Sequence, residues 1–578
     1  MKFAERFFEL NKSKILKLIL IGVIVILIGN AIAISRDYQD SWILEGLEIP
    51  FVLFVVTYAL AFFSEKSALS LVALAVIGRA VFLLIPNLKY VWFQGTAIDQ
   101  NQQYALANYV YNQGYIATQG PSLVFFYIRS PLIHLTFATF SIVSSIPVVE
   151  SVKYIPVLLS PIFPLLTYVI VKNLFPRETP MLKYALFISS IPITVEKYAV
   201  TGSQFGVLLM FFILTSIVML LQKNDRRHWS VFVFFTLVLP IAHSVSSLLT
   251  AMLLLAIMLF QKIPYSRLKP YLRPSVALLA IVSCTAWLTF SATSALENLV
   301  DVIVRGVVMG VSPAPVENLP SRFFELAHVS ILEAAKVLLA LNGGEILLLL
   351  LTIGGFVILL RMRRQLNDTS RYFLLISFLM LAFIPIGVLI KVGVFRALHF
   401  VSPLFPIFSS IFILHLTKRR IWLRAVILSS IVLLVILQLY RCQPLIPSAN
   451  VLSKDLPANE PIVYASQVNS IYQRRMIKFA EHYTIGQIAC DDVTRSQIIG
   501  LTDLNFSATR LAWYYPLDKH QLEKKYDYFL IHLPGASGRI DEQAEIRTRD
   551  LILGAIYNSS IIYTNGESYV LAHTPTQP

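Results

Sequence analysis

The chain has 578 residues, of which 56% are hydrophobic and 14% are charged, and its formal net charge is +15. A soluble globular protein is about 45–50% apolar and about 25% charged, so this composition excludes an ordinary soluble or disordered chain and indicates a membrane protein. The three cysteines exclude a disulfide scaffold and the common zinc and iron–sulfur spacings.

Apolar runs near the length of about 20 residues that crosses a bilayer recur along the first part of the chain. In order they are 15–34, 49–63, 68–85, 154–171, 183–200, 203–222, 275–292, 345–360, 372–391, 398–416 and 421–440. The run 230–260 is too long for one span, and Pro240 and His243 interrupt it, so we expect two short spans that turn near His243. The sequence therefore predicts an α-helical polytopic fold with about 13 transmembrane helices. We expect the further apolar stretch 131–146 to lie on the outer interface.

The predicted organisation is a transmembrane domain, 1–440, followed by a soluble domain, 441–578. Within the first we expect two outer loops, 86–153 and 293–344. The tail has strand-like runs at Pro461–Ala465 and Tyr526–Leu533, an amphipathic stretch at 466–482, and a terminal β-hairpin pattern around Asn565-Gly566. These patterns predict a small extracytoplasmic α/β domain.

The net charge divides unevenly at Tyr440. Residues 441–578 hold 13 basic and 14 acidic side chains, a net charge of −1, whereas residues 1–440 hold 35 basic and 19 acidic side chains, a net charge of +16. The basic residues of the first part gather at the ends of apolar runs, which is the positive-inside pattern and not the exposed basic face of a nucleic-acid binder. This pattern predicts an integral plasma-membrane protein with a cytoplasmic N-terminus and no nucleic-acid partner.

Asp99 is the only acidic residue of the first outer loop before Glu150, and it follows a membrane span in a polar, aromatic segment. A carboxylate held at the membrane edge can act as a general base toward an acceptor hydroxyl or amide. The alternative interpretation is a solvated loop aspartate or a helix cap. Three further residues of this loop are candidates to line the same cavity: Gln100, Tyr104 and Arg129.

Two cations, Lys391 and Arg396, lie at the outer end of a span, where positive-inside statistics disfavour them. Such cations at head-group level suggest a buried anion partner, and a lipid phosphate or pyrophosphate is suitable. Snorkelling to the outer lipid head groups is the alternative.

Ionisable residues within or beside other spans are candidate functional groups by default. Arg79 lies about two-thirds across its span, where it could pair with a carboxylate or snorkel outward. Glu196 and Lys197 lie near an outer span end, where simple exposure is the alternative. His243 marks the expected hairpin turn, and a hydrogen-bonded structural role is its alternative.

The order of these features resembles the GT-C superfamily of polytopic glycosyltransferases, which use polyprenyl-phosphate-linked sugars. The features that carry the resemblance are the Asp99 loop after an early span, the segment Ser130-Pro131-Leu132-Ile133-His134-Leu135, the basic turn Leu174-Phe175-Pro176-Arg177, the hairpin with His243, the segment Phe395-Arg396-Ala397-Leu398 and the outward α/β tail.

The resemblance implies an inverting transfer of a sugar from a polyprenyl-phosphate donor to a glycan, lipid or protein acceptor on the outer face of the membrane. It implies Asp99 as the catalytic carboxylate and Arg396, with Lys391, as ligands of the donor phosphate. The groups that it places along the cavity are His243, Glu196 and Lys197. Many members carry paired acidic residues in the first outer loop, whereas Gln100 follows Asp99 here. This departure leaves a divalent metal possible but not indicated, and no cofactor is assigned.

Two other classes of function stay open on the sequence. A transporter or flippase of a lipid-linked or anionic substrate would use the same cations, but it predicts inverted repeats with matching broken helices, and the sequence has no matching halves. A non-catalytic membrane assembly protein would keep the fold without the chemistry.

Overall fold

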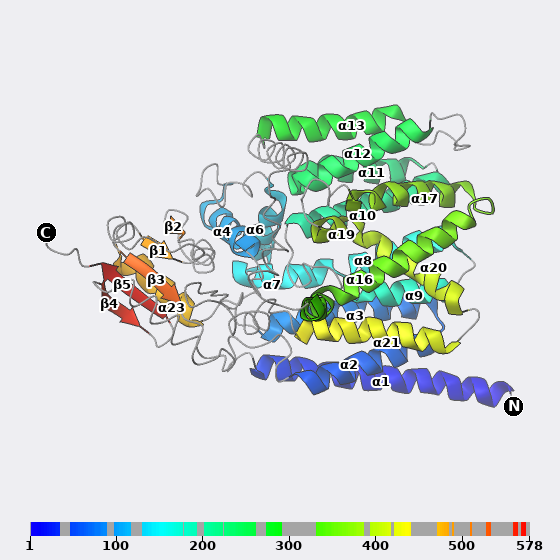
Figure 1. The fold of residues 1–578 in the computed structure, drawn as a ribbon, viewed down its shortest axis with the longest axis horizontal. Helices are drawn as coiled ribbons and strands as arrows, with labels where there is room; N and C mark the ends of the chain where they lie inside the picture. Colours follow the sequence, from blue (N-terminus) through cyan, green and yellow to red (C-terminus); the bar gives the residue numbers. More distant parts are fainter. Residues whose placement is uncertain are drawn as a thin grey trace.

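The structure is a computed structural model, and it consists of a helical bundle and a small sheet (Figure 1). The residues that it describes are 2–34, 47–89, 98–116, 130–176, 179–192, 202–223, 225–261, 273–291, 331–385, 394–417, 421–440, 471–484, 488–490, 509–510, 528–532, 559–564 and 568–573.

Helices of the first half form from the predicted apolar runs and from part of the first outer loop. They are α1 (Lys2–Ile34), α2 (Glu48–Ser64), α3 (Ala68–Lys89), α4 (Ile98–Gln113), α6 (Leu132–Ser144), α7 (Val148–Leu159), α8 (Ile162–Leu174), α9 (Thr179–Ser190) and α10 (Gly202–Gln222).

Helices of the second half also form mainly from the predicted apolar runs. They are α11 (Arg226–Ala242), α12 (Ser244–Gln261), α13 (Pro274–Ala286) with a π-helical extension η2 (Trp287–Ser291), α16 (Ile331–Arg361), α17 (Asp368–Leu381), α19 (Val394–Val401) with a 3-10 turn η3 (Ser402–Leu404), α20 (Phe405–Thr417) and α21 (Ile421–Tyr440).

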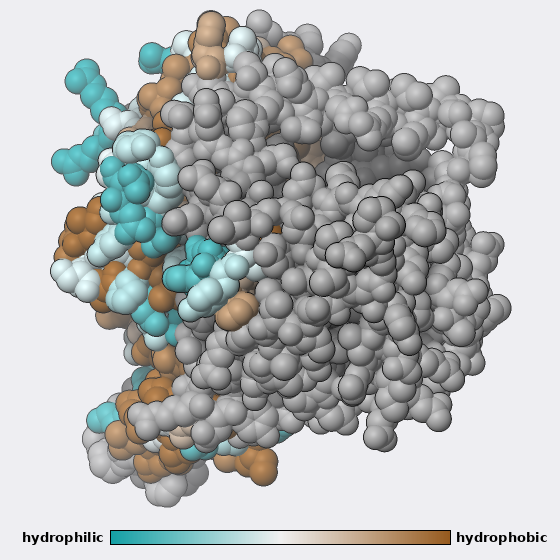
Figure 2. All heavy atoms as spheres, turned by 90° about the vertical axis from the view of Figure 1, so that its left-hand side faces the viewer, coloured by the Kyte–Doolittle hydropathy of each residue, from teal (hydrophilic) through white to brown (hydrophobic). Residues whose placement is uncertain are grey.

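Eight of the described segments are helical, long and apolar enough to cross a membrane, so the chain is a polytopic helical membrane protein. They are Ser13–Ile34, Ala68–Ile85, Val148–Leu174, Gln204–Gln222, Ser244–Gln261, Gly343–Arg361, Asp368–Pro385 and Leu398–Leu416. Large apolar side chains also face outward on α1 and α2, where Leu18 is 69% and Ile49 75% exposed. Figure 2 shows hydrophobic surface predominating at the lower edge, where Figure 1 places these two helices. The total of 13 spans stays a prediction.

Several helix ends differ from the predicted runs, mostly at prolines. The predicted span 154–171 is divided between two helices, because α7 ends at Leu159 and α8 begins at Ile162, after Ser160 and Pro161. Helix α9 ends at Ser190, two residues before Pro192, because the residue that precedes a proline is disfavoured in the helical conformation. Helix α16 begins at Ile331, so its first turns occupy part of the predicted outer loop 293–344. The predicted break at His243 is confirmed, because α11 ends at Ala242 and α12 begins at Ser244.

The tail contains a five-stranded sheet and one described helix, α23 (Ile471–Tyr483). Its strands are β1 (Ile488–Cys490), β2 (Thr509–Arg510), β3 (Tyr528–His532), β4 (Ser559–Thr564) and β5 (Ser568–His573), in the order β2-β1-β3-β5-β4. The pairs β1–β2 and β1–β3 are parallel, whereas β3–β5 and β4–β5 are antiparallel. The β4–β5 pair is the predicted terminal hairpin, and α23 lies within the predicted amphipathic stretch except for its last residue. The run Pro461–Ala465 lies outside the described residues.

Buried apolar side chains form two clusters. The larger one joins the long helices of the bundle from Leu20 of α1 to Ile431 of α21. The smaller one joins α4, α6 and α7 with α23 and β1 of the tail; it contains Ala107, Ile133, Phe137, Val148, Val152, Ile155, Met476, Ile477, Ala480 and Ile488. In Figure 1, α4 and α6 accordingly lie between the bundle and the sheet. We call this smaller cluster the junction core.

Candidate functional site

Asp99 lies in the first turn of α4, which begins at Ile98. A negative side chain is favourable there because the first turn carries the partial positive charge of the helix dipole and unpaired N–H groups. Gln100 shares this turn, and one turn later Tyr104 is half-buried and packs against the junction core. The side chains of Asp99 and Gln100, and the whole of Arg129, lie outside the described residues.

Helix α6 connects the Asp99 helix with the rest of the bundle, together with α7, which also contacts α4 and packs on α3. Helix α6 contacts α4, α7 and α11. Its contact with α7 includes a short hydrogen bond between the hydroxyls of Ser141 and Ser151, both fully buried. The predicted interfacial stretch 131–146 is thus a packed helix of 13 residues, shorter than the roughly 20 residues that cross a bilayer.

His243 forms the N-cap of α12 through its imidazole. Its backbone is extended, with φ −162° and ψ 111°. Its Nδ1 accepts a hydrogen bond from the backbone N–H of Ser246 at 3.2 Å and lies 2.8 Å from the Ser246 hydroxyl oxygen. Because Nδ1 is the acceptor, the neutral ring carries its proton on Nε2. The alternative interpretation of His243 as a hydrogen-bonded structural residue is therefore confirmed for one of its two nitrogens.

The start of α10 packs closely against this cap. A Cβ added to Gly206 would lie 2.7 Å from the Cβ of His243 and nearer still to the hydroxyl of Ser246, so only glycine allows the approach. The neighbouring Phe205 packs against both the large cluster and the junction core. The His243 corner is therefore continuous with the packing around α4 and α6.

Helix α19 brings Arg396 toward the same corner. The rings of His243 and Phe400 stack with centroids 6.4 Å apart and planes at 27°. Arg396 precedes Phe400 by four residues, which is about one helical turn. The structure thus connects the helices that carry Asp99, His243 and Arg396 through α6, α10 and α11. The side chain of Arg396 and the residues Lys391, Glu196 and Lys197 lie outside what the structure describes.

Arg79 caps the end of α9 inside the bundle. Its guanidinium donates from Nη1 to the carbonyl of Ser189 at 2.8 Å and to that of Ile191 at 3.5 Å. It also lies over the ring of Phe163, 4.6 Å from the centroid. The last carbonyls of a helix have no partner within it, so this cation satisfies groups that would otherwise be unpaired among apolar side chains. Arg79 therefore joins α3, α8 and α9.

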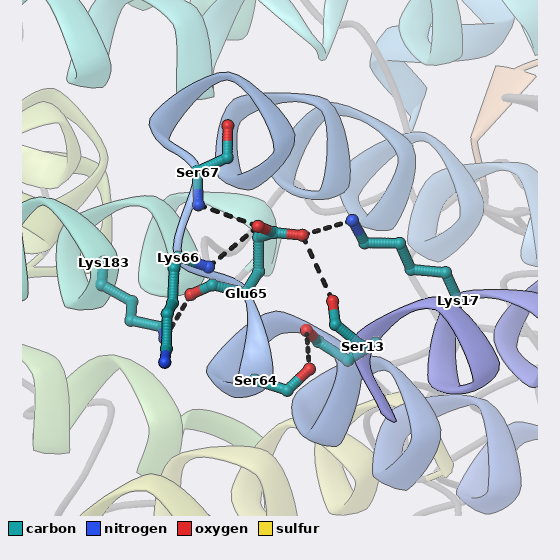
Figure 3. Close-up of polar contacts among 8 residues, drawn as sticks. Ser13, Lys17, Ser64, Glu65, Lys66, Ser67 and Lys183 are labelled. Carbon is teal, nitrogen blue, oxygen red and sulfur yellow. Dashed lines mark hydrogen bonds and ion pairs between the residues drawn. The ribbon is translucent and has the colours of Figure 1, made fainter. Parts of the chain in front are cut away.

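A second polar centre surrounds Glu65 in the turn between α2 and α3 (Figure 3). Its carboxylate forms an ion pair with Lys17 of α1 and accepts from the backbone N–H groups of Lys66 and Ser67, each at 2.8 Å. Lys183 of α9 donates to the Glu65 carbonyl at 2.7 Å. Burial alone would raise the pKa of Glu65, but Lys17 and the two N–H groups hold it below its ordinary value. The centre joins α1, the turn between α2 and α3, and α9, and the Glu65 carboxylate is paired with Lys17.

Besides Glu65, several buried ionisable residues are not marked as candidates by the sequence, among them Glu345, Lys153 and His134. Glu345 of α16 is 1% exposed, Lys153 of α7 is 5% exposed, and His134 of α6 has no exposed surface. Lys153 pairs with Glu150 at 3.5 Å. The available signal was an acid after Gly343-Gly344 at the head of an apolar run, and a histidine in the apolar stretch 131–146. The sequence places the histidine in the stretch expected at the interface and the acid at the first residue of the predicted span 345–360, and neither position by itself predicts a buried charge.

No group of three or more His, Cys, Asp or Glu side chains in the described part of the chain could hold a metal ion. No protein-family model matches the chain, and no curated protein matches it. The class of protein that the geometry defines is therefore a polytopic helical membrane protein, and its activity is argued from its residues alone.

Proposed function

We propose that this protein is an integral-membrane glycosyltransferase of inverting type, with Asp99 as general base. It moves a sugar from a polyprenyl-phosphate donor to an acceptor at the outer face of the membrane, with the N-terminus in the cytoplasm and the tail outside. The observation that supports the proposal best is the packing that links the Asp99 helix, through α6 and α10, to the His243 corner and the Arg396 helix.

The chemistry divides among these residues. An acceptor hydroxyl or amide attacks the anomeric carbon, its proton passes to Asp99, and the bond from that carbon to the phosphate oxygen breaks. Negative charge grows on the departing polyprenyl phosphate, where Arg396 and Lys391 stabilise it, since preorganised cations act most strongly where charge develops. The imidazole of His243 is held in one orientation by its hydrogen bond from the Ser246 N–H, beside the helix that carries Arg396.

The test compares the protein in lipid vesicles with Asp99→Asn, using radiolabelled polyprenyl-phosphate sugars and candidate acceptors. Loss of a general base lowers the rate by about 10²–10⁴-fold, so we expect Asp99→Asn to lose transfer while it still binds the donor. Glu150→Gln is the matched control, because Glu150 is the next acid along the chain after Asp99 and lies in a different helix, α7. Transfer that Asp99→Asn retains in full would exclude Asp99 as the base.

A transporter or flippase is the second candidate, and one feature favours it. Helix α9 has only 12 residues and ends beside Arg79 within the bundle, and interrupted helices line the substrate sites of many carriers. The same vesicles, loaded with labelled lipid-linked sugar, separate the two functions. Passage of the lipid from one leaflet to the other without transfer to an acceptor would favour the carrier.

A further inference from the structure

His134 is the most unusual buried polar group in the described part of the chain. It lies in the first turn of α6, its side chain has no exposed surface, and neither ring nitrogen has a hydrogen-bond partner among the described residues. A buried donor or acceptor without a partner is destabilising, and most such groups in folded proteins are paired. The ring thus has two hydrogen-bonding nitrogens that no described residue satisfies, which lowers the stability of the fold.

The position of this ring connects it with the proposed site. Helix α6 packs between α4, which carries Asp99, and α11, which ends at the His243 corner. Its neighbours in sequence and on the next turn, Ile133 and Phe137, are members of the junction core. His134 thus lies on the element that joins the two halves of the site.

The protonation state of the ring limits what it can bind. Burial lowers the pKa of His134 to about 3, so the imidazole is neutral at physiological pH. A neutral imidazole offers one donor and one acceptor. A hydroxyl group offers the same pair in return, whereas a phosphate offers acceptors alone and is better served by cations such as Arg396.

We propose that His134 binds a hydroxyl group of the donor sugar, donating one hydrogen bond to it and accepting another from it. The inference rests on the proposed function and deepens it, because it assigns recognition of the sugar to α6 and recognition of the phosphate to Arg396 and Lys391. Binding completes the hydrogen bonds of a ring that has no partner among the described residues. Since the ring is covered there, a packing neighbour shifts as the sugar enters.

The experiment measures thermal unfolding of the full-length protein in detergent, with and without ligand. The probes are a polyprenyl-phosphate hexose, its four monodeoxy hexose analogues, and polyprenyl phosphate alone. The variants are His134→Leu, which removes both hydrogen-bonding positions at similar volume, and His134→Gln, which restores one donor and one acceptor. Ser141→Ala is the control, because it alters a buried polar residue of the same helix that already has a partner in Ser151.

Four results are expected. Without ligand, His134→Leu unfolds at the same temperature as the unaltered protein or higher, whereas Ser141→Ala unfolds lower. The unaltered protein binds the hexose lipid about tenfold more tightly than one deoxy analogue, which is the effect of a single hydrogen bond worth about 1.4 kcal/mol. His134→Leu binds both with equal affinity. His134→Gln recovers part of the difference, while all variants bind polyprenyl phosphate alone equally.

The results that overturn the inference are distinct from those that overturn the function. If His134→Leu lowers the unfolding temperature without ligand and keeps the preference for the hydroxylated sugar, His134 is a structural residue and the inference fails while the transferase stands. If the unaltered protein binds neither the hexose lipid nor polyprenyl phosphate and transfers no sugar, the proposed function fails and the inference fails with it.

Discussion

The contact between α16 and α20 offers a sharp test of the bundle. A Cβ added to Gly355 would lie 2.6 Å from the backbone carbonyl carbon of Phe408, and nearer still to its oxygen. Backbone atoms cannot rotate away, so Gly355→Ala forces the two helices apart by about 1.5 Å to bring the nearer atom, the Phe408 oxygen, to an ordinary contact of roughly 3.5 Å. Small residues at membrane-helix interfaces allow this kind of close approach.

Two opposing contributions determine how much Gly355→Ala changes the free energy of unfolding. Overpacking a well-packed interior costs about 1–3 kcal/mol, and a clash with rigid backbone belongs at the upper end. Replacing a helical glycine by alanine returns about 1 kcal/mol. We therefore expect Gly355→Ala to lower the free energy of unfolding by about 2 kcal/mol.

Two matched variants separate the clash from the general effect of alanine. At Gly354 the added Cβ would meet only the ring of Phe412, at 2.5 Å, and a side chain can turn aside. At Gly22 of α1 nothing lies within 4 Å. Unfolding in mixed micelles, followed by tryptophan fluorescence, should rank Gly22→Ala as most stable and Gly355→Ala as least. Equal stability of Gly354→Ala and Gly355→Ala would refute the packing argument.

Two further predictions concern the charged groups inside the bundle and at its end. Arg79→Leu leaves the carbonyls of Ser189 and Ile191 unpaired, so we expect a loss of about 1–3 kcal/mol in the same unfolding assay, and unchanged stability would contradict the capping role. The pKa of Glu65 is lower in the folded protein than its ordinary value of 4.5, so its ion pair stabilises the fold at pH values above 4.5. This stabilisation is lost as the pH falls through the pKa that Glu65 has in the folded protein. Glu65→Gln should therefore be destabilising at pH 7 and progressively less so in acid, as measured by unfolding midpoints across pH; a difference that is constant with pH would count against it.

Local features of the fold were predictable from the sequence because local chemistry determines them. Pro240 and His243 indicated the break between α11 and α12, and the alternating pattern around Asn565-Gly566 indicated the β4–β5 hairpin. The amphipathic stretch 466–482 predicted α23 because a helix with one apolar face must bury it. In each case the signal lies within a few residues of the feature.

The arrangement of the candidate site was not predictable in the same way. Nothing in the sequence indicates that Phe400 stacks on His243 or that α6 bridges α4 and α11, because these contacts join segments far apart in the chain. For a related reason, the sequence does not mark His134 as a candidate. Its apolar surroundings looked like interface in the sequence, and only packing shows that the ring is enclosed.

The junction core has a consequence for how the protein is made. Phe137 of α6 and Met476 of α23 belong to one buried cluster, although about 340 residues separate them. A chain that emerges from its N-terminus completes the bundle segments first, and α4, α6 and α7 must wait for the tail before their apolar faces are covered. The helix that carries Asp99 therefore reaches its final packing late in synthesis, so that a chain stopped short of α23 would insert its membrane helices and still lack a finished site.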